Sequence, residues 1–401
     1  MLARRSNTLV VAYFILTRAL TAVNDYDNDA ATWRPITLRA VAGIVQHRIR
    51  SIRSRRMNPS ARQSMGPSKT WVTELGFGCG TLGDPDEVTS DEQAQAALQT
   101  GWDAGIRYFD TAPWYGNTKS EHRAGQFLRN QPRDAFVLST KVGRVYSRPS
   151  APAQFSQSEF ASRWRGGLPF VLRFDYSASG IRRAYEDSLQ RLGLNRVDFL
   201  VIHDLDPRHQ KGEEGVHRGI EQLDSGGGFA ELASLRARGE ISAIGAGVNH
   251  IGMIPRLLER FDIDYFLVAM PYTLLDQEVL NGELQLCVER GVRVVIGAVF
   301  ASGILATGAT NNAQYRYQSV PPDVRAKVEH MQRLCAQHAI TLSAAALQFP
   351  LAHPAVATVI PGANSPAQVR SNVAAFRTDI PPAFWSALRE QGLIDADAPL
   401  P

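Results

Sequence analysis

The feature that most restricts the fold of this chain is a regular alternation of short apolar runs with longer amphipathic stretches, which begins at Thr73. Eight of these runs are almost continuously apolar and rich in β-branched residues, as is typical of strands that are buried on both faces. They are residues 74–80, 107–112, 135–142, 197–203, 241–248, 264–270, 292–300 and 356–363. The pattern therefore predicts eight parallel strands.

The stretches between the runs carry the signals of helices. Helices are predicted at 91–105, 177–193, 227–239 and 276–291, and all four ranges end in glycine. Ser177 and Gly193 are suited to cap the second of them. Two more helices are predicted within residues 318–354. Residues 143–176 form a long aromatic-rich loop after the third strand, and such loops usually carry function in barrels.

Eight strand–helix units in succession predict the α/β class, and within it a (β/α)8 TIM barrel over residues 71–401. A doubly wound open sheet is the structural rival. It is disfavoured because no G-x-G-x-x-G turn opens a helix after the first strand. The glycines of residues 76–83 have other spacings and lead into an acidic loop, which would be a poor site for phosphate.

The charge is divided unevenly along the chain. The net charge is +4, yet residues 1–70 hold twelve Lys and Arg against three Asp, so the remainder is mildly acidic. A basic segment can bind nucleic acid or membranes, but the arginines of residues 47–56 lack interleaved aromatic residues. We interpret residues 1–70 as a basic extension that is disordered or precedes the native start at Met57 or Met65, and we expect no nucleic-acid partner.

No segment predicts a membrane span. The apolar run at 8–17 follows two arginines and mimics a secretory signal, but it is shorter than the about 20 residues that a span requires. The three cysteines, Cys79, Cys287 and Cys335, have no metal-ligand spacing, and their low, odd number indicates a reducing compartment. We therefore expect a cytoplasmic protein without a metal site or a membrane partner.

Polar residues stand at the ends of three neighbouring predicted strands. Asp110 ends the second strand, Lys141 the third and His203 the fourth, while Tyr115 follows on the loop after Asp110. Active sites of TIM barrels are built at this end of the strands, so these side chains are expected to converge. Each alone is explained as a cap, a solvated charge, a core histidine or a packing residue. Together they include a lysine within an apolar strand, which requires a partner.

These four residue types suit proton transfer. The ordinary pKa of tyrosine is about 10, and a nearby ammonium group lowers it. We expect Lys141 to lower the pKa of Tyr115, Asp110 to hold Lys141, and His203 to hydrogen-bond the reacting oxygen. Such a set suits the interconversion of a carbonyl and an alcohol by hydride transfer.

Two segments around these residues resemble the signature regions of the aldo-keto reductase family. They are GIRYFDTAPWYGNTKSE at 105–121 and YEDSLQRLGLNRVDFLVIH at 185–203. The resemblance extends from about Thr73 to Phe376, and the spacing of the four polar residues matches the catalytic tetrad of that family. It implies that Asp110, Tyr115, Lys141 and His203 are catalytic and that a nicotinamide dinucleotide binds in an extended form across the barrel mouth.

The resemblance also implies positions for this cofactor. Asn249 matches a residue that contacts the nicotinamide carboxamide, and Phe300 matches one that stacks on the nicotinamide ring. The loop after the seventh strand matches the pyrophosphate-binding loop, and residues 360–372 match the adenosine-binding turn. The residues implied there are Ser302, Gly303 and Leu305 for the pyrophosphate, and Gly362, Ser365, Gln368 and Asn372 for the adenosine.

The chain departs from the family pattern at two cofactor positions. A glutamine that often follows the sixth strand is replaced by Met270 and Tyr272. Asn364 stands where many NADP-preferring members have a basic residue, and a 2′-phosphate requires a cation. NAD is therefore favoured over NADP, and Arg370 is the residue that would support NADP.

Within the family, the chain resembles the sugar-dehydrogenase branch. The segments that carry this likeness are KVGRVY (141–146), RFDYS (173–177), IHDLD (202–206), MPYTLLD (270–276) and VFASGILA (299–306). The likeness implies oxidation of the anomeric hydroxyl of an L-fucose-, D-threo-aldose- or L-galactose-like sugar to its lactone, with Tyr115 as the base. The expected pocket walls are Trp114, Trp164, Phe170 and Phe174.

Three other functions remain open at this point. They are a general NADPH-dependent reductase of aldehydes or ketones, a pyridoxal dehydrogenase, and a cofactor-sensing regulatory subunit that docks through its basic N-terminal segment. The intact set of four polar residues argues against a purely regulatory role.

Overall fold

The computed structural model describes residues 57–68, 70–151, 163–269 and 271–401. The first 56 residues of the predicted extension and Met270 lie outside this range. Within it, no helix combines the length and the apolar character needed to cross a bilayer.

Eight parallel strands form one sheet in the order β3-β4-β5-β8-β9-β10-β11-β14. Leu75 and Gly78 form parallel bridges to Val359 and Gly362, and these bridges join the first strand to the last. The sheet therefore closes, and the predicted TIM barrel is confirmed. Each predicted apolar run contains one strand: β3 Phe77–Gly78, β4 Tyr108–Asp110, β5 Val137–Val142, β8 Phe199–Ile202, β9 Ala243–Val248, β10 Tyr265–Ala269, β11 Arg293–Gly297 and β14 Val356–Val359.

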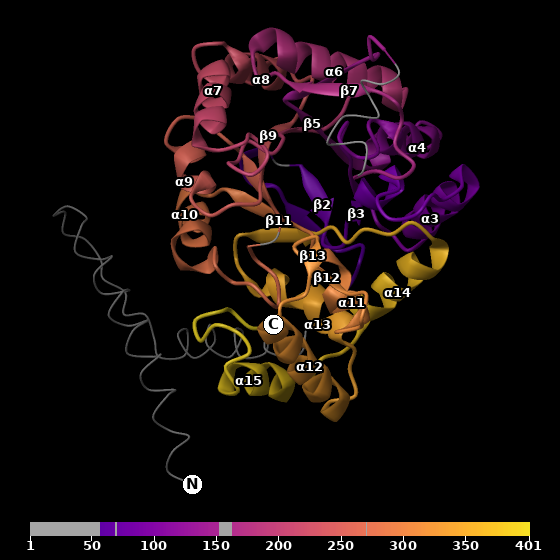
Figure 1. The fold of residues 1–401 in the computed structure, drawn as a ribbon, viewed down its shortest axis with the longest axis vertical. Coiled ribbons are helices and arrows are strands. Elements are labelled where there is room, and N and C mark those ends of the chain that lie inside the picture. The colour runs from indigo at the N-terminus through magenta and orange to yellow at the C-terminus, as the bar shows by residue number, and fades with distance from the viewer. Residues whose placement is uncertain (1–56, 69, 152–162, 270) are drawn as a thin grey trace, which may run out of the picture. The chain divides into compact units, whose positions relative to one another are not determined.

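Helices surround this ring of strands (Figure 1). Those predicted from the sequence are α3 Asp91–Asp103, α6 Ala178–Leu192, α8 Gly228–Ala237, a π-helical turn Leu280–Leu284 continued by α10 Gln285–Arg290, α12 Pro322–Gln337 and α13 Leu342–Gln348. The sequence analysis missed α4 Lys119–Leu128, α7 Glu213–Leu223, α9 Met253–Leu258, α11 Ile304–Thr307, α14 Pro366–Arg377 and α15 Pro382–Glu390. The caps of α6 are as expected, because the Ser177 side chain accepts from the Gly180 amide and Gly193 is left-handed with φ 62°.

Within the described residues, three hairpins add to the barrel. β1 Arg62–Ser64 and β2 Trp71–Thr73 pair antiparallel, and Val72 of β2 and Met65, which follows β1, are buried among the inward-facing barrel residues. The predicted extension therefore includes residues that pack on the barrel. The hairpin of β12 Gln314–Tyr315 and β13 Gln318–Ser319 follows β11. The predicted loop 143–176 contains the third, formed by β6 Arg144–Ser147 and β7 Val171–Phe174.

The alternation of side chains along the strands decides which residues reach the barrel mouth. Tyr108 and Phe199 belong to the apolar cluster that fills the barrel interior, whereas Phe109 and Leu200 belong to the larger core beneath the helices. Asp110 lies two residues after Tyr108, and His203 lies four residues after Phe199. Because side chains alternate along a strand, Asp110 and His203 point inward like Tyr108 and Phe199, above the apolar interior of the barrel. The inward positions at the carboxyl ends of the strands are therefore polar.

Candidate active site

The deepest part of the site is a buried ion pair between two neighbouring strands. Lys141 Nζ lies 2.6 Å from Asp110 Oδ2, and the two side chains are only 1% and 2% exposed. The ammonium group also donates to the Thr111 carbonyl at 2.8 Å, and the Ser139 hydroxyl donates to Asp110 Oδ1 at 2.6 Å. The charge of Lys141 is therefore neutralised by Asp110, as a buried charge requires.

Tyr115 and His203 lie next to this pair. Lys141 Nζ is 4.8 Å from the centroid of the Tyr115 ring, and the Tyr115 and His203 rings have centroids 6.0 Å apart. Tyr115 comes from a turn in which its amide donates to the Ala112 carbonyl at 3.1 Å. The structure therefore brings together all four polar residues of the predicted catalytic set.

An ion-pair network holds the loop that carries Tyr115. The ammonium group of Lys119 donates to Asp84 Oδ2 at 2.7 Å and to the Gly166 carbonyl at 3.0 Å, while Arg123 donates to Asp84 Oδ1 at 2.7 Å. Burial favours a neutral Asp84, but the hydrogen bonds from Lys119 and Arg123 outweigh it and hold the pKa of Asp84 below its usual range. The sequence analysis did not identify this network.

The protonation state of Tyr115 differs from the expectation. Burial, followed by the negative charge of Asp110 and then of Asp204, raises the pKa of Tyr115 well above its usual value. The expected net lowering of this pKa is not found, because burial and the two carboxylates outweigh the ammonium charge of Lys141, which pairs with Asp110 at 2.6 Å. Tyr115 is consequently a protonated phenol at neutral pH.

Two residues that the sequence analysis did not select lie beside His203. Arg144, the first residue of β6, pairs with Asp204 at 2.5 Å between Nη2 and Oδ2. The same carboxylate oxygen lies 3.2 Å from His203 Nε2. Burial lowers the pKa of His203 well below its usual value, and Arg144 and Lys141 oppose the contrary effect of Asp204. His203 is therefore a neutral imidazole.

Beyond Asp204 lies a hydrogen-bonded acidic cluster. The Asn249 amide donates to Asp204 at 2.9 Å and to Asp206 at 3.1 Å, and His209 Nδ1 lies 2.9 Å from Asp206 Oδ1. The ligand atoms of Asp204, Asp206 and His209 lie within 4.8 Å of one another, a spacing that a metal ion would accept. Donors of the protein already engage both carboxylates, so the cluster is satisfied by hydrogen bonds and by Arg144.

Of the aromatic residues that were predicted as pocket walls, Trp164 lies against Tyr115, and Trp114 precedes Tyr115 in the chain. The Trp164 ring lies 5.5 Å from that of Trp114 and 6.0 Å from that of Tyr115, measured between centroids. Phe174 lies under the guanidinium of Arg144, at 4.8 Å. Phe170, just before β7, is 37% exposed. Trp114 and Trp164 are therefore the predicted wall residues that adjoin the tetrad.

The residues expected to bind pyrophosphate follow β11. Ser302 and Gly303 have left-handed backbones, with φ 62° and 100°, and the Ser302 hydroxyl accepts from the Tyr317 amide at 3.0 Å. Leu305 is fully buried and its amide donates to the Phe300 carbonyl at 3.1 Å, so Leu305 supports the loop from the core side. Phe300 is half-buried and packs against the same core.

The residues expected to bind adenosine begin α14. Ser365 is the N-cap of this helix and accepts from the Gln368 amide. Gln368 in turn accepts from the Asn364 amide at 2.9 Å, and the Asn372 side chain donates to the Gly362 carbonyl at 3.4 Å. A side chain on Gly362 would come within 2.8 Å of Thr81, so this turn is closely packed against the loop after β3. The hydroxyl and amide groups of this turn suit the polar parts of a dinucleotide.

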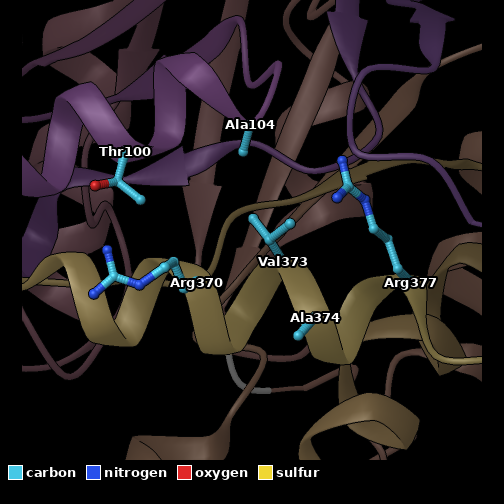
Figure 2. Close-up of a pocket in the computed structure, with 6 residues that line it drawn as sticks. All are labelled: Thr100, Ala104, Arg370, Val373, Ala374 and Arg377. Carbon is cyan, nitrogen blue, oxygen red and sulfur yellow. The ribbon is translucent and has the colours of Figure 1, made fainter.

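Two other residues that were considered for the cofactor, Tyr272 and Arg370, lie away from the barrel mouth. Tyr272, which stands near the expected glutamine, is fully buried and packs against Phe349 and His353, so its side chain does not reach the mouth. Arg370, considered for a 2′-phosphate, lines a cavity of about 330 Å³ on the outside of the barrel, between α3 and α14. Figure 2 shows Arg370 across from Thr100, with Val373 beside it in the same cavity.

At the mouth of the barrel, Tyr115 and His203 are both uncharged at neutral pH, and each lies next to a buried ion pair. The family match and the dehydrogenases to which the chain is similar make it an oxidoreductase that acts on CH–OH groups. The chain belongs to the aldo/keto reductase family, whose model matches residues 74–392. Enzymes of this family use a nicotinamide dinucleotide and act on small carbonyl or hydroxyl compounds.

Several known proteins are similar to this chain. It is 40% identical over 342 residues to pyridoxal 4-dehydrogenase of Microbacterium luteolum, and the match covers 84% of this chain and 99% of that protein. It is 36% identical over 326 residues to D-threo-aldose 1-dehydrogenase of a Pseudomonas species, with 80% and 95% of the two chains covered. The holo form of an aldo-keto reductase from Bacillus halodurans has a similar structure, with a TM-score of 0.63, 25% identity, and 85% and 98% coverage.

Proposed function

We propose that this enzyme oxidises the anomeric hydroxyl of an aldose to the corresponding lactone, with NAD as the preferred hydride acceptor. The observation that carries the proposal is the contact of Tyr115 with the buried Lys141–Asp110 pair on one side and with His203 on the other. This arrangement offers two neutral proton-carrying groups to a single oxygen atom of a substrate.

Each of the four residues has its own role in the proposed reaction. Tyr115 first loses its own proton, and the resulting phenolate takes the proton of the substrate hydroxyl, while His203 orients the oxygen by a hydrogen bond. Lys141 lies 4.8 Å from the phenol ring and stabilises the phenolate when it forms, while Asp110 holds Lys141 in place. The bound dinucleotide supplies the acceptor for the hydride of the substrate carbon.

The choice of an aldose is supported by the sugar-dehydrogenase segments of the sequence and by the 36% identity to an aldose 1-dehydrogenase. The 40% identity to a pyridoxal dehydrogenase favours pyridoxal as the second candidate. An aldose and pyridoxal have a chemical feature in common, since both close to a ring hemiacetal whose oxidation gives a lactone. The faces of Trp114 and Trp164 suit the flat side of either ring.

The preference for NAD is supported by the surroundings of the predicted adenosine turn. Asn364 stands at the position of the basic residue of NADP-preferring relatives, and its amide donates to the carboxylate of Glu87 at 3.3 Å. A 2′-phosphate next to this carboxylate would meet a negative charge. Arg370, which lines the outer cavity with Thr100 and Val373, does not offset it.

A cytoplasmic location is part of the same proposal. It is supported by Cys79, Cys287 and Cys335, which are all buried and free as thiols, as suits a reducing compartment.

A substrate panel combined with one point variant tests the proposal. NADH formation is measured with L-fucose, D-threo-aldoses, L-galactose and pyridoxal, and NADPH consumption is measured with simple aldehydes. Tyr115→Phe is expected to lower kcat/KM for the best substrate by about 10²- to 10⁴-fold, because it removes the proton carrier. Tyr185→Phe, on the outer helix α6, is the matched control and is expected to keep full activity.

The outcomes of the panel separate the candidates. Activity on pyridoxal alone would favour the second candidate, and NADPH consumption with simple aldehydes but not sugars would favour a general reductase. Full activity of Tyr115→Phe would exclude Tyr115 as the proton carrier. Absence of any turnover in the wild-type protein would favour the regulatory role.

A further inference from the structure

The residue that follows His203 is turned back towards the site. Asp204 has a left-handed backbone with φ 49°, a conformation that is uncommon for residues other than glycine. Its side chain is 10% exposed, and Oδ2 lies 3.2 Å from His203 Nε2. The strain of this conformation therefore brings a carboxylate next to the imidazole.

Arg144 forms an ion pair with this carboxylate. Its side chain is 1% exposed and its Nη2 lies 2.5 Å from Asp204 Oδ2, while Nε and Nη1 have no hydrogen-bond partner among the described residues. The guanidinium lies 4.4 Å from the centroid of the Trp114 ring and 4.8 Å from that of Phe174. Because Arg144 pairs with Phe174 across the β6–β7 hairpin, that hairpin sets the position of the cation.

The contacts of His203 differ between its two ring nitrogens. Nε2 faces the Asp204 carboxylate, whereas Nδ1 is buried without a hydrogen-bond partner in the described part of the chain. A carboxylate favours a proton on the nitrogen that faces it. Among the described residues Nδ1 has no acceptor for a proton, so it is better left unprotonated. The contacts therefore favour the neutral tautomer with its proton on Nε2.

The charges around His203 balance. Asp204 alone would favour the imidazolium form, and Arg144 offsets it by binding the same oxygen. Among the described residues, the other charged or titratable groups next to His203 are Lys141 from β5, Tyr115 from the loop after β4, His209 from the loop after β8 and Tyr176, whose hydroxyl donates to the His203 carbonyl at 2.7 Å. Since Asp110 neutralises Lys141, Arg144 is the cation whose removal changes this balance most directly.

We propose that Arg144 and Asp204 are a positioning pair, which keeps His203 neutral with its proton on Nε2, ready to donate to the oxygen of the substrate. The activity part of this inference rests on the proposed function, whereas the state of the imidazole does not. Neither residue touches the reacting atoms in this scheme, and both act through His203.

The test uses the full-length enzyme and the variants Arg144→Met, Asp204→Asn and the double variant. Long-range ¹H–¹⁵N NMR of protein labelled at histidine nitrogens reports the tautomer and the charge of His203, with His203→Gln used to assign its signal. The pH dependence of kcat/KM is measured on the best substrate of the panel. Arg144→Lys is the conservative variant, because it keeps the charge but loses the planar stacking surface.

The proposal predicts a distinct result for each variant. Arg144→Met leaves Asp204 unbalanced, so His203 takes up a proton and kcat/KM at pH 6 falls about tenfold relative to pH 8. Asp204→Asn allows both tautomers and lowers kcat without this loss at acidic pH. The double variant does not show the fall in kcat/KM at pH 6. Arg144→Lys has a pH profile between those of the wild type and Arg144→Met.

Two results would overturn the proposal. One is a wild-type spectrum with the His203 proton on Nδ1 or with a charged ring at pH 7. The other is an Arg144→Met variant that binds dinucleotide normally, and so is folded, yet has an unchanged pH profile and an unchanged His203 signal. Because the spectrum needs no substrate, failure of the sugar panel alone would count against the proposed function and leave this inference intact.

Discussion

Replacing Lys141 with methionine would separate the structural weight of the buried ion pair from its role in catalysis. The substitution keeps the length of the side chain and removes the charge that neutralises Asp110 at 2.6 Å. Asp110 would retain the hydrogen bond from Ser139 at 2.6 Å, but it would be left as a lone carboxylate inside the barrel.

The size of the effect follows from the burial of the pair. Both side chains are at most 2% exposed, and removal of one partner from such a pair lowers the free energy of unfolding by about 3–5 kcal/mol. The double variant Asp110→Asn with Lys141→Met leaves no lone charge and should be more stable than Lys141→Met alone.

The assay is equilibrium unfolding in urea at pH 7, followed by tryptophan fluorescence and by circular dichroism. Arg183→Met is the matched control, since Arg183 pairs with Asp187 at the same distance of 2.6 Å but is 57% exposed. It is expected to change the free energy of unfolding by no more than about 0.5 kcal/mol. The reasoning would be refuted if Lys141→Met lost less than about 1 kcal/mol, or if the double variant were as unstable as the single one.

Three further predictions concern the proton carrier, its loop and the cofactor. Because burial and Asp110 raise the pKa of Tyr115, the phenolate needed for oxidation is scarce at neutral pH; kcat/KM for oxidation should rise with pH from 7 to 10, that for the reverse reduction should fall, and a flat oxidation profile would contradict this. Gly116 has φ 68°, and a Cβ there would lie 2.6 Å from the Gly83 carbonyl oxygen, so Gly116→Ala should lower the free energy of unfolding by about 1–3 kcal/mol in a thermal-shift assay. Gly247→Ala, whose Cβ would meet nothing closer than 3.7 Å, is its control, and equal effects would argue against the clash. Glu87→Gln should improve the affinity for NADP relative to NAD by about two- to fivefold in fluorescence titrations, whereas an unchanged ratio would place the 2′-phosphate elsewhere.

The barrel and its polar mouth could be predicted from the sequence because both follow from local patterns. Each buried strand gives an apolar run, and the two-residue period of a strand places Asp110, Lys141 and His203 inward at the same end. The helix α14 also had a local signal, since Ser365 followed by Pro366 is a typical helix start. The resemblance to the adenosine-binding turn of the family predicts only a turn at this point.

Other parts of the site depend on contacts between segments far apart in the chain. Arg144 and Asp204 are 60 residues apart, and they meet only because the β6–β7 hairpin folds back and Asp204 adopts a left-handed backbone. The one local hint was an arginine between apolar residues after Lys141, which is unusual unless the arginine is paired. The weak effect of Lys141 on the pKa of Tyr115 could not be predicted from the sequence either, because it depends on the distance between Lys141 and Asp110.

The two buried ion pairs have a joint consequence for the chemistry. Lys141 with Asp110 and Arg144 with Asp204 each place a positive and a negative charge next to one proton carrier, so the four charges sum to zero at the mouth. The raised pKa of Tyr115 and the lowered pKa of His203 keep both carriers uncharged over the neutral range. An uncharged hydroxyl compound can therefore bind between them without leaving a charge unpaired, whereas an anionic substrate group would be buried without a partner, because Lys141 and Arg144 are already paired.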